Sequence, residues 1–437
     1  MCLYPREMKN KRYEPTKKNG GNVPSCPDDR LRSVPVPCGN CKECRKKKKQ
    51  EWMVRLSEDI KHHKNGKFVT LTFNNEKLLE HEKLVSKQIQ GYERENKAVS
   101  IAMTRFLERW RKTYGKSVRH CLITELGHRN TERIHLHGFI WTDEDGSEIA
   151  RHWKNGDITI GEKKYYVKNI SERKTEVKIG YGTEGYVNEK SVNYITKYIN
   201  KLDKDHKYYK SKMYISNGIG KGYEDSIQFI NNMYRGKKGE DTIETYTTRK
   251  GVKVSLPKYY REKLYTERQR EQLWINKLNL NIRYVNKTPV DISENMEAYY
   301  KVRNEARVTN TFQGYGSNWK DTIIEYLENS NRNRLAWCRA NGKNPRMIKD
   351  PQKEVYNQHQ ESILKVTKLE HDTKKIEWDI NPSAEKKFRK PTKAKKINKL
   401  IEENKENWGI FNNKNFKINE ILKNPNKTWE EVTKSKE

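Results

Sequence analysis

The stretch from Ile134 to Trp141, with the sequence IHLHGFIW, constrains the fold more than any other part of the chain. Its apolar and aromatic residues are typical of a buried strand. Because side chains alternate between the two faces of a strand, His135 and His137 lie on one side and Leu136 lies on the other. Two imidazoles side by side on a rigid sheet can bind a divalent metal ion. We therefore predict a sheet with a metal site on one face.

A second predicted strand, His120 to Leu126, supplies a third candidate ligand. If the two strands pair across a turn centred near residue 130, Glu125 lies opposite His135, and directly paired residues share a face. A slip of one residue would turn Glu125 away. In the predicted register Glu125, His135 and His137 form a metal site that leaves coordination positions open for phosphate oxygens, as Lewis-acid catalysis requires.

A helix is predicted from Asn188 to Leu202, with Asn188 as its N-terminal cap. At about 100° per residue, one side of this helix is aliphatic, with Val192, Ile195, Ile199 and Leu202. The opposite side carries two phenols and two ammonium groups, from Tyr194, Lys197, Tyr198 and Lys201. A phenolate attacks phosphorus well only when charge on the phosphate is neutralised, which a metal ion and a nearby lysine can do. We therefore predict that the two tyrosines are nucleophiles and that each lysine serves the neighbouring phosphate.

The charge of the chain indicates a nucleic-acid partner. Among 437 residues, 91 are Lys or Arg and 58 are Asp or Glu, which gives a formal net charge of +33. An AT-rich genome explains Lys in place of Arg, but it does not explain this excess of basic over acidic residues. A polyanion is therefore expected as partner, and nucleic acid is the default. One basic run is either the solvated start of a helix or, as the net charge favours, a phosphate-binding patch: Arg45, Lys46, Lys47, Lys48 and Lys49.

Five of the seven cysteines lie within the first 44 residues. This usage fits a reducing cytoplasm and a metal site better than a disulfide framework. Cys38, Cys41 and Cys44 follow a CxxCxxC pattern, and either Cys26 or Cys2 can complete four thiolates for tetrahedral Zn²⁺. The alternative is a set of reduced cysteines packed under a small N-terminal loop.

The remaining pattern predicts helices at 46–63 and 97–114, a strand from Lys67 to Phe73 and further strands within 153–187. The other histidines, among them His120, His152 and His206, are expected at the surface. No signal peptide and no membrane-spanning segment is predicted, so a membrane is not expected as a partner.

Four blocks of the chain resemble the replication-initiation proteins of the Microviridae, small circular single-stranded DNA phages, and specifically those of the gokushovirus type. The blocks are Val36 to Arg45, Phe68 to Phe73, Thr124 to Gly138 with its intervening turn, and Tyr194 to Lys201. The resemblance covers about residues 26 to 265. It departs from the family at Leu126, where an aromatic residue is common.

The resemblance implies an α+β fold, in which an HUH endonuclease domain has a central antiparallel sheet flanked by helices. It also implies that the protein uses Mg²⁺ or Mn²⁺ to nick single-stranded viral origin DNA. Tyrosine becomes joined to the 5′ phosphate, and a 3′ hydroxyl is left as primer. The second tyrosine then cuts the regenerated origin, and rejoining of the ends releases circles. The implied partners are the origin DNA and the host helicase and polymerase, in the cytoplasm of a host bacterium.

On this interpretation the chain has four regions. They are a Cys-rich basic segment at 1–50, the HUH endonuclease domain at 51–235, a helical accessory region at 236–345, and a charged, Lys- and Asn-rich tail at 346–437 that belongs to a mostly helical C-terminal part.

Two other interpretations remain open. One is an HUH endonuclease of a plasmid or a transposon. The other, from a different class, is a non-enzymatic, zinc-dependent nucleic-acid-binding protein, in which the cysteines and basic runs carry the function and the histidines only pack. A covalent protein–DNA adduct separates an enzyme from a binding protein.

Overall fold

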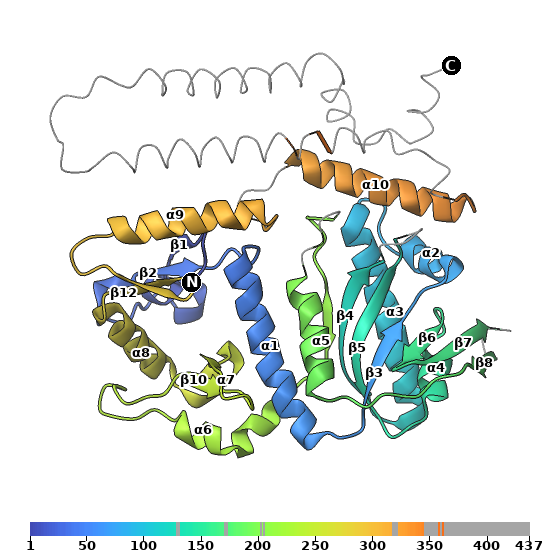
Figure 1. Ribbon diagram of the computed structural model, residues 1–437, viewed down its shortest axis with the longest axis horizontal. Helices are drawn as coiled ribbons and strands as arrows, with labels where there is room; N and C mark the ends of the chain where they lie inside the picture. Colours follow the sequence, from blue (N-terminus) through green and yellow to red (C-terminus); the bar gives the residue numbers. More distant parts are fainter. Residues whose placement is uncertain are drawn as a thin grey trace, which may run out of the picture. The chain divides into compact units, whose positions relative to one another are not determined.

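The computed structural model describes residues 1–127, 132–169, 174–201, 203, 206–316 and 322–344, together with 357, 358 and 361. The chain divides into two units, Met1–Lys349 and Asp350–Glu437. Every helix and strand named below belongs to the first unit (Figure 1). Apart from those three positions, the predicted tail at 346–437 lies outside the described residues.

A seven-stranded antiparallel sheet lies at the centre of the fold, with the strand order β8-β7-β6-β3-β5-β4-β9. Its strands are β3 (Gly66–Leu71), β4 (Arg119–Leu126), β5 (Ile134–Trp141), β6 (Ile158–Ile160), β7 (Lys163–Asn169), β8 (Thr175–Ile179) and β9 (Met213–Ile215). In the β4–β5 ladder Glu125 pairs with His135, which confirms the predicted hairpin register. The predicted α+β fold with a central antiparallel sheet is also confirmed.

Helices cover both faces of this sheet, and the alternation of side chains decides which residues each layer meets. Even-numbered residues such as Leu122 and Leu136 pack in the core that includes α3 (Gly91–Tyr114). The helices α2 (Asn75–Lys83) and α4 (Gly146–Trp153) contribute to the same core. Odd-numbered residues such as Ile123 and Phe139 pack against α1 (Lys42–His62) and α5 (Glu189–Asn200). The histidines of β5 share this second face, so they face α1 and α5.

The helix α5 forms as its sequence predicts. The Asn188 side chain accepts a hydrogen bond from the backbone N–H of Ser191, so it caps the helix as expected. Val192, Ile195 and Ile199 are buried against the sheet and α1, while Leu202 lies outside the described residues. The aliphatic side of α5 therefore fixes the helix and turns its tyrosines toward the β5 histidines.

The opposite side of α1 packs against a second lobe (Figure 1). There Val54 shares a core with aromatic side chains that include Tyr223 and Tyr260. The elements of this part are η4 (Lys221–Asp225), α6 (Ile227–Asn231), β10 (Thr245–Thr247), β11 (Lys253–Ser255), α7 (Lys258–Leu264) and α8 (Glu267–Asn279). The helix α1 is thus a shared wall between the sheet and this lobe.

The N-terminal segment closes on residues that follow much later in the chain. Leu3 and Cys41 share a core with Val285, Tyr299 and Ala306. The N-terminal elements are β1 (Arg6–Lys9), η1 (Lys11–Tyr13), η2 (Lys17–Asn19), η3 (Asp29–Leu31) and β2 (Ser33–Val36); the later ones are β12 (Ile282–Val285), β13 (Thr288–Asp291) and α9 (Glu297–Phe312). The region predicted as a helical accessory part therefore also contains two short hairpins, β10–β11 and β12–β13.

The last described helix, α10 (Thr322–Ala340), is held to α2 and α3 by buried ion pairs. Arg332 contacts Glu95 at 2.8 Å, and Arg339 contacts Glu82 at 2.6 Å. All four side chains are at most 2% exposed, so each charge is compensated inside the protein. Among the described residues, no helix is long and apolar enough to cross a membrane.

The expectation that the remaining histidines lie at the surface is wrong for His120, His152 and His206, which are all buried. Each has hydrogen-bond partners: His120 lies 2.9 Å from the carbonyl of Val118, His152 lies 2.8 Å from that of Glu148, and His206 contacts Tyr92. A buried imidazole is tolerated when its nitrogens are paired in this way.

Candidate active site

The predicted metal ligands meet on the face of the sheet that is turned toward α5. One donor atom from each of Glu125, His135 and His137 lies within 4.8 Å of the others. The Nε2 atoms of His137 and His135 lie 2.9 Å and 3.4 Å from Oε2 of Glu125. We call these three residues the triad. Their spacing follows directly from the β4–β5 register.

Two further contacts orient the imidazoles of the triad. Nδ1 of His135 donates to the carbonyl of Arg133 at 3.2 Å, and Nδ1 of His137 lies 2.9 Å from the hydroxyl of Thr70. With Nδ1 engaged in this way, Nε2 of each ring is the atom that faces the carboxylate. Thr70 was not among the predicted site residues, because it comes from β3, whose pairing with β5 places it opposite His137.

The electrostatics of the triad favour its deprotonated forms. Burial alone would raise the pKa of Glu125, but hydrogen bonds from His135, His137 and Lys201 hold it well below its usual range. Burial lowers the pKa of His137. A carboxylate and neutral imidazoles are the forms that bind a metal ion.

The two tyrosines of α5 lie beside the triad. The ring of Tyr198 stacks on that of His137, with centroids 4.8 Å apart and an angle of 15° between the planes. The Tyr198 hydroxyl donates to the Tyr194 hydroxyl at 2.7 Å. Burial, the hydrogen bond with Tyr194 and the charge of Glu125 all raise the pKa of Tyr198. Both phenol oxygens therefore lie in one place, and Tyr198 is the one directly against a triad ring.

The lysines of α5 accompany the tyrosines. Lys201 forms an ion pair with Glu125, and its Nζ lies 5.8 Å from the centre of the Tyr198 ring. Nζ of Lys197 lies 5.9 Å from the centre of the Tyr194 ring. The structure thus gathers the three predicted metal ligands and the four predicted residues of α5 on one side of the sheet.

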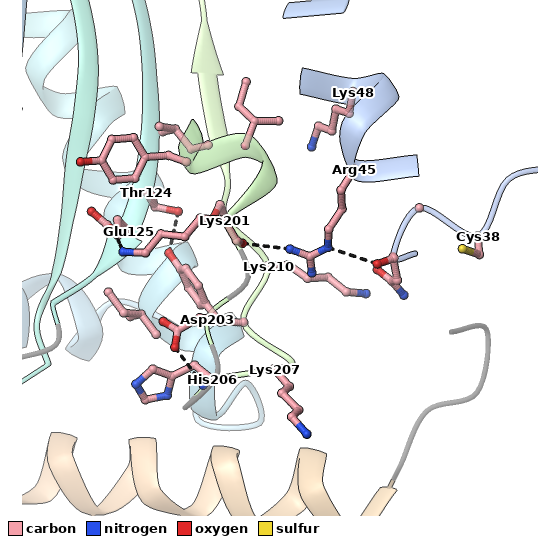
Figure 2. Close-up of a pocket in the computed structure, with 18 residues that line it drawn as sticks. Cys38, Arg45, Lys48, Thr124, Glu125, Lys201, Asp203, His206, Lys207 and Lys210 are labelled. Atoms are coloured by element: carbon pink, nitrogen blue, oxygen red, sulfur yellow. Dashed lines mark hydrogen bonds and ion pairs between the residues drawn. The ribbon is translucent and has the colours of Figure 1, made fainter. Parts of the chain in front are cut away.

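A cavity of about 430 Å³ opens beside the triad, and we call it the cleft (Figure 2). It is lined by Glu125 and Tyr198 and by several cationic side chains: Arg45, Lys48, Lys201, Lys207 and Lys210. Nη1 of Arg45 donates to the carbonyl of Lys201 at 3.0 Å, which joins the start of α1 to the end of α5. The cleft therefore has the charge needed to accept a phosphate chain next to the tyrosines.

The predicted basic run occupies the first turns of α1 and divides between two cavities. Arg45 and Lys48 line the cleft, whereas Lys46 and Lys47 line a second cavity on the other side of α1. Lys49 is half-buried on the same helix. The run is therefore part of a helix, as one interpretation expected, and four of its members also line cavities.

The N-terminal cysteines form a second group of candidate metal ligands. The Sγ atoms of Cys2, Cys38, Cys41 and Cys44 lie within 4.8 Å of one another, and we call these four residues the cysteine cluster. Thiol hydrogen bonds, of which that from Cys2 is the strongest, lower the pKa of Cys38. Four cysteines at this spacing can hold a metal ion such as Zn²⁺.

The choice of Cys26 as the fourth ligand is corrected by the structure, which brings Cys2 to the cluster instead. The thiol of Cys26 donates to the carbonyl of Asp28 at 3.1 Å. Cys2 is held in place because its neighbour Leu3 is buried. In addition, the backbone N–H of Cys38 donates to Sγ of Cys2 at 3.2 Å.

Comparison with known proteins places the site in a recognised context. Residues 66–203 match the family model of the replication-associated protein ORF2. The chain is also 28% identical over 267 residues to the replication-associated protein ORF2 of Spiroplasma virus 4, an alignment that covers 54% of this chain and 69% of that relative. No solved structure was found to match the chain. The matched segment 66–203 runs from β3 past the end of α5, so the triad and both tyrosines lie in the part of the chain that is similar to replication-associated proteins.

Proposed function

We propose that this chain is a rolling-circle replication initiator of a small circular single-stranded DNA phage of the Microviridae. In this function it nicks the viral origin by tyrosine attack and remains joined to the 5′ phosphate. The observation that carries the proposal is the contact of Tyr198 with the triad, in which its ring stacks on His137 at 4.8 Å. A nucleophile beside a set of metal ligands, in a cationic cleft, is an arrangement suited to phosphoryl transfer.

The triad suits Mg²⁺ or Mn²⁺, because two imidazoles and one carboxylate leave coordination positions open to a substrate. His135, His137 and Glu125 would hold the ion, with Nε2 of each ring directed to the carboxylate side. When bound, such an ion polarises a phosphate oxygen as a Lewis acid. Because Lys201 pairs with Glu125, its ammonium group is also next to the phosphate site.

The nick is a phosphoryl transfer that needs no external energy. Oη of Tyr198 forms a bond to phosphorus, the bond from phosphorus to the 3′ oxygen breaks, and that oxygen takes up a proton and leaves as a hydroxyl. The Tyr198 proton has an exit in its hydrogen bond to Tyr194. The new tyrosine–phosphate ester conserves the energy of the broken phosphodiester, so rejoining is the reverse reaction with another 3′ hydroxyl.

Two phenols that are 2.7 Å apart allow two successive cleavages. While one tyrosine holds the first 5′ end, the other is free to cut the regenerated origin. Rejoining then releases a unit-length circle. In this scheme the host polymerase extends the 3′ hydroxyl, and a host helicase opens the duplex, in the cytoplasm of the host bacterium.

The polarity of the adduct tests the proposal. The protein is incubated with Mg²⁺ or Mn²⁺ and single-stranded origin DNA that is labelled at either the 3′ or the 5′ end, and the products are separated under denaturing conditions. A 5′-phosphotyrosine link attaches the 3′-labelled fragment to the protein and leaves a shorter 5′-labelled fragment that polymerase can extend.

The variant that carries both Tyr194→Phe and Tyr198→Phe is the matched control, because it keeps both rings and removes only the nucleophilic oxygens. It should form no adduct. Binding of DNA without any adduct from the unaltered protein would favour the non-enzymatic, zinc-dependent alternative. Peptide mapping of the adduct to a different tyrosine would contradict the proposed nucleophiles.

A further inference from the structure

The helix α1 separates two cavities, and its basic run faces both of them. The second cavity has a volume of about 1010 Å³, and we call it the lobe groove. It is formed by the N-terminal segment, α1, β11, α8, β12 and α9. These elements lie on the side of α1 away from α5 (Figure 1). Most of the groove therefore comes from outside residues 66–203, the part that resembles replication-associated proteins.

The lining of the lobe groove is strongly cationic. Seven of its side chains are Lys or Arg and two are Glu. The cations come from different elements: Lys46 and Lys47 from α1, Lys253 from β11, Arg283 from β12 and Arg303 from α9. Cations that converge from several elements on one concavity form a site for a chain of phosphates rather than for a single anion.

Aromatic rings are interleaved with these cations. Tyr284 of β12 and Tyr300 of α9 both line the groove and are 49% and 45% exposed. The guanidinium of Arg303 lies 4.9 Å from the centre of the Tyr300 ring and 5.1 Å from that of the buried Tyr299. Exposed rings offer a stacking surface to unpaired bases, whereas the bases of a duplex are already stacked on one another.

We propose that the lobe groove binds single-stranded DNA at a site separate from the cleft, with bases on Tyr284 and Tyr300 and phosphates on the surrounding cations. The choice of DNA as the polymer rests on the proposed function. Since α1 separates this groove from the tyrosines, DNA held there stays on the protein while the cleft exchanges one cut end for another.

Binding can be measured apart from cleavage in the full chain with Tyr194→Phe and Tyr198→Phe. The probe is a fluorescent single-stranded oligonucleotide of about 30 nucleotides, longer than the roughly 4–16 that one binding groove takes. In this background Tyr284→Ser with Tyr300→Ser should weaken binding about tenfold or more, because two stacking surfaces are lost. Tyr284→Phe with Tyr300→Phe keeps both rings and should bind within about twofold of the parent.

Two further measurements make the test independent of any loss of folding in the serine variant. Lys46→Gln with Lys47→Gln should reduce the slope of log affinity against log salt by about 1.4, at about 0.7 for each phosphate contact on a single strand. Photocrosslinking of bromodeoxyuridine-substituted DNA should label the peptides that contain Tyr284 and Tyr300.

Equal binding by the serine and parent proteins, or crosslinks confined to the cleft, would refute the groove as a DNA site. Tighter binding of duplex, weakened by the lysine variant and not by the serine variant, would refute the single-stranded assignment. Failure of the proposed function has a different signature, since the protein with both tyrosines would then form no adduct while these binding results stand.

Discussion

The triad and the cysteine cluster differ in how the chain builds them. In each, the donor atoms lie within 4.8 Å of one another. The triad comes from two paired strands, β4 and β5, whose ladder holds Glu125 opposite His135. The cysteine cluster instead joins Cys2 to a loop and to the start of α1, where Cys41 is the N-terminal cap residue. One group is positioned by a sheet, and the other is positioned by segments with little regular structure.

This difference indicates different roles for a bound ion. A site that the backbone already holds can keep open coordination positions for a substrate. A site that must draw separate segments together gives its binding energy to folding instead. We therefore expect that metal loss at the triad stops chemistry and leaves the fold intact, whereas metal loss at the cysteine cluster loosens the N-terminal part of the fold.

The largest effect is expected for His137→Ala. Nicking should fall by more than about a hundredfold, since a ligand matters more than the outer partners that typically change activity 10–100-fold. DNA binding should stay nearly unchanged, because it depends on phosphate contacts spread over many cations. The measurements are adduct formation, oligonucleotide affinity and melting temperature. His62→Ala, at an exposed histidine in the last turn of α1, is the control. A lowered melting temperature in His137→Ala would erase the contrast between the two sites.

The next effect concerns Cys38→Ser. Loss of one thiolate should remove bound Zn²⁺ and lower the free energy of unfolding by more than about 2 kcal/mol, a fraction of the roughly 10–16 kcal/mol that structural zinc supplies to small domains. Metal content by mass spectrometry and thermal unfolding are the measurements. Cys26→Ser is a matched control, because Cys26 lies outside the cluster and should leave both values unchanged. Loss of zinc in the Cys26 variant would restore the original ligand assignment.

A smaller effect is expected for Thr70→Val, which removes the hydroxyl beside Nδ1 of His137. Nicking should fall about tenfold, the lower end for an outer partner of a metal ligand. Thr70→Ser keeps the hydroxyl and should retain most activity, so the pair of variants separates orientation of the ring from packing. Titration of activity against Mn²⁺ concentration measures the change. Equal activity in the valine and serine variants would mean that the sheet alone orients the imidazole.

The smallest effect uses acid, because the sheet carries the buried His120 and residues 1–44 contain no histidine. Burial lowers the folded-state pKa of His120, so below about 6.5 the unfolded chain binds the proton first. Stability from this group is complete above that pH and is lost as the pH falls toward the folded-state value. His120→Gln should flatten this loss by at most about 1.4 kcal/mol per pH unit. Denaturant unfolding between neutral and acid pH measures the slope, and an identical slope in the variant would exclude His120 as a source.

Local pattern was enough to predict the sheet and the register around the triad. The strands β4 and β5 are joined by a short turn, so pairing across its centre determines the partner of Glu125. The aliphatic spacing of α5 likewise predicted its buried side. In both cases the residues that determine the geometry are close together in the sequence.

Contacts between distant parts of the chain were not predictable in this way. Cys2 reaches the cluster because Leu3 packs against residues near 290, and Thr70 meets His137 only through the β3–β5 pairing. The helix α3 begins at Gly91 rather than near residue 97, and Glu95 in its first part is buried by Arg332, which lies 237 positions later. The helix α1 begins at Lys42, in a polar stretch without an apolar stripe to predict it.

The long separation between Leu3 and its partners has a consequence for synthesis of the protein. Arg307 donates from Nε to the carbonyl of Leu3 at 2.8 Å, although it follows 304 positions later. At about 5–20 residues per second, ribosomes need roughly 15–60 s to make that intervening chain. All four thiols of the cysteine cluster emerge early in this interval, long before α9 exists to cover Leu3. Ion capture by the nascent chain is therefore available as an early step of its maturation, and docking of the N-terminal segment must wait until translation has passed α9.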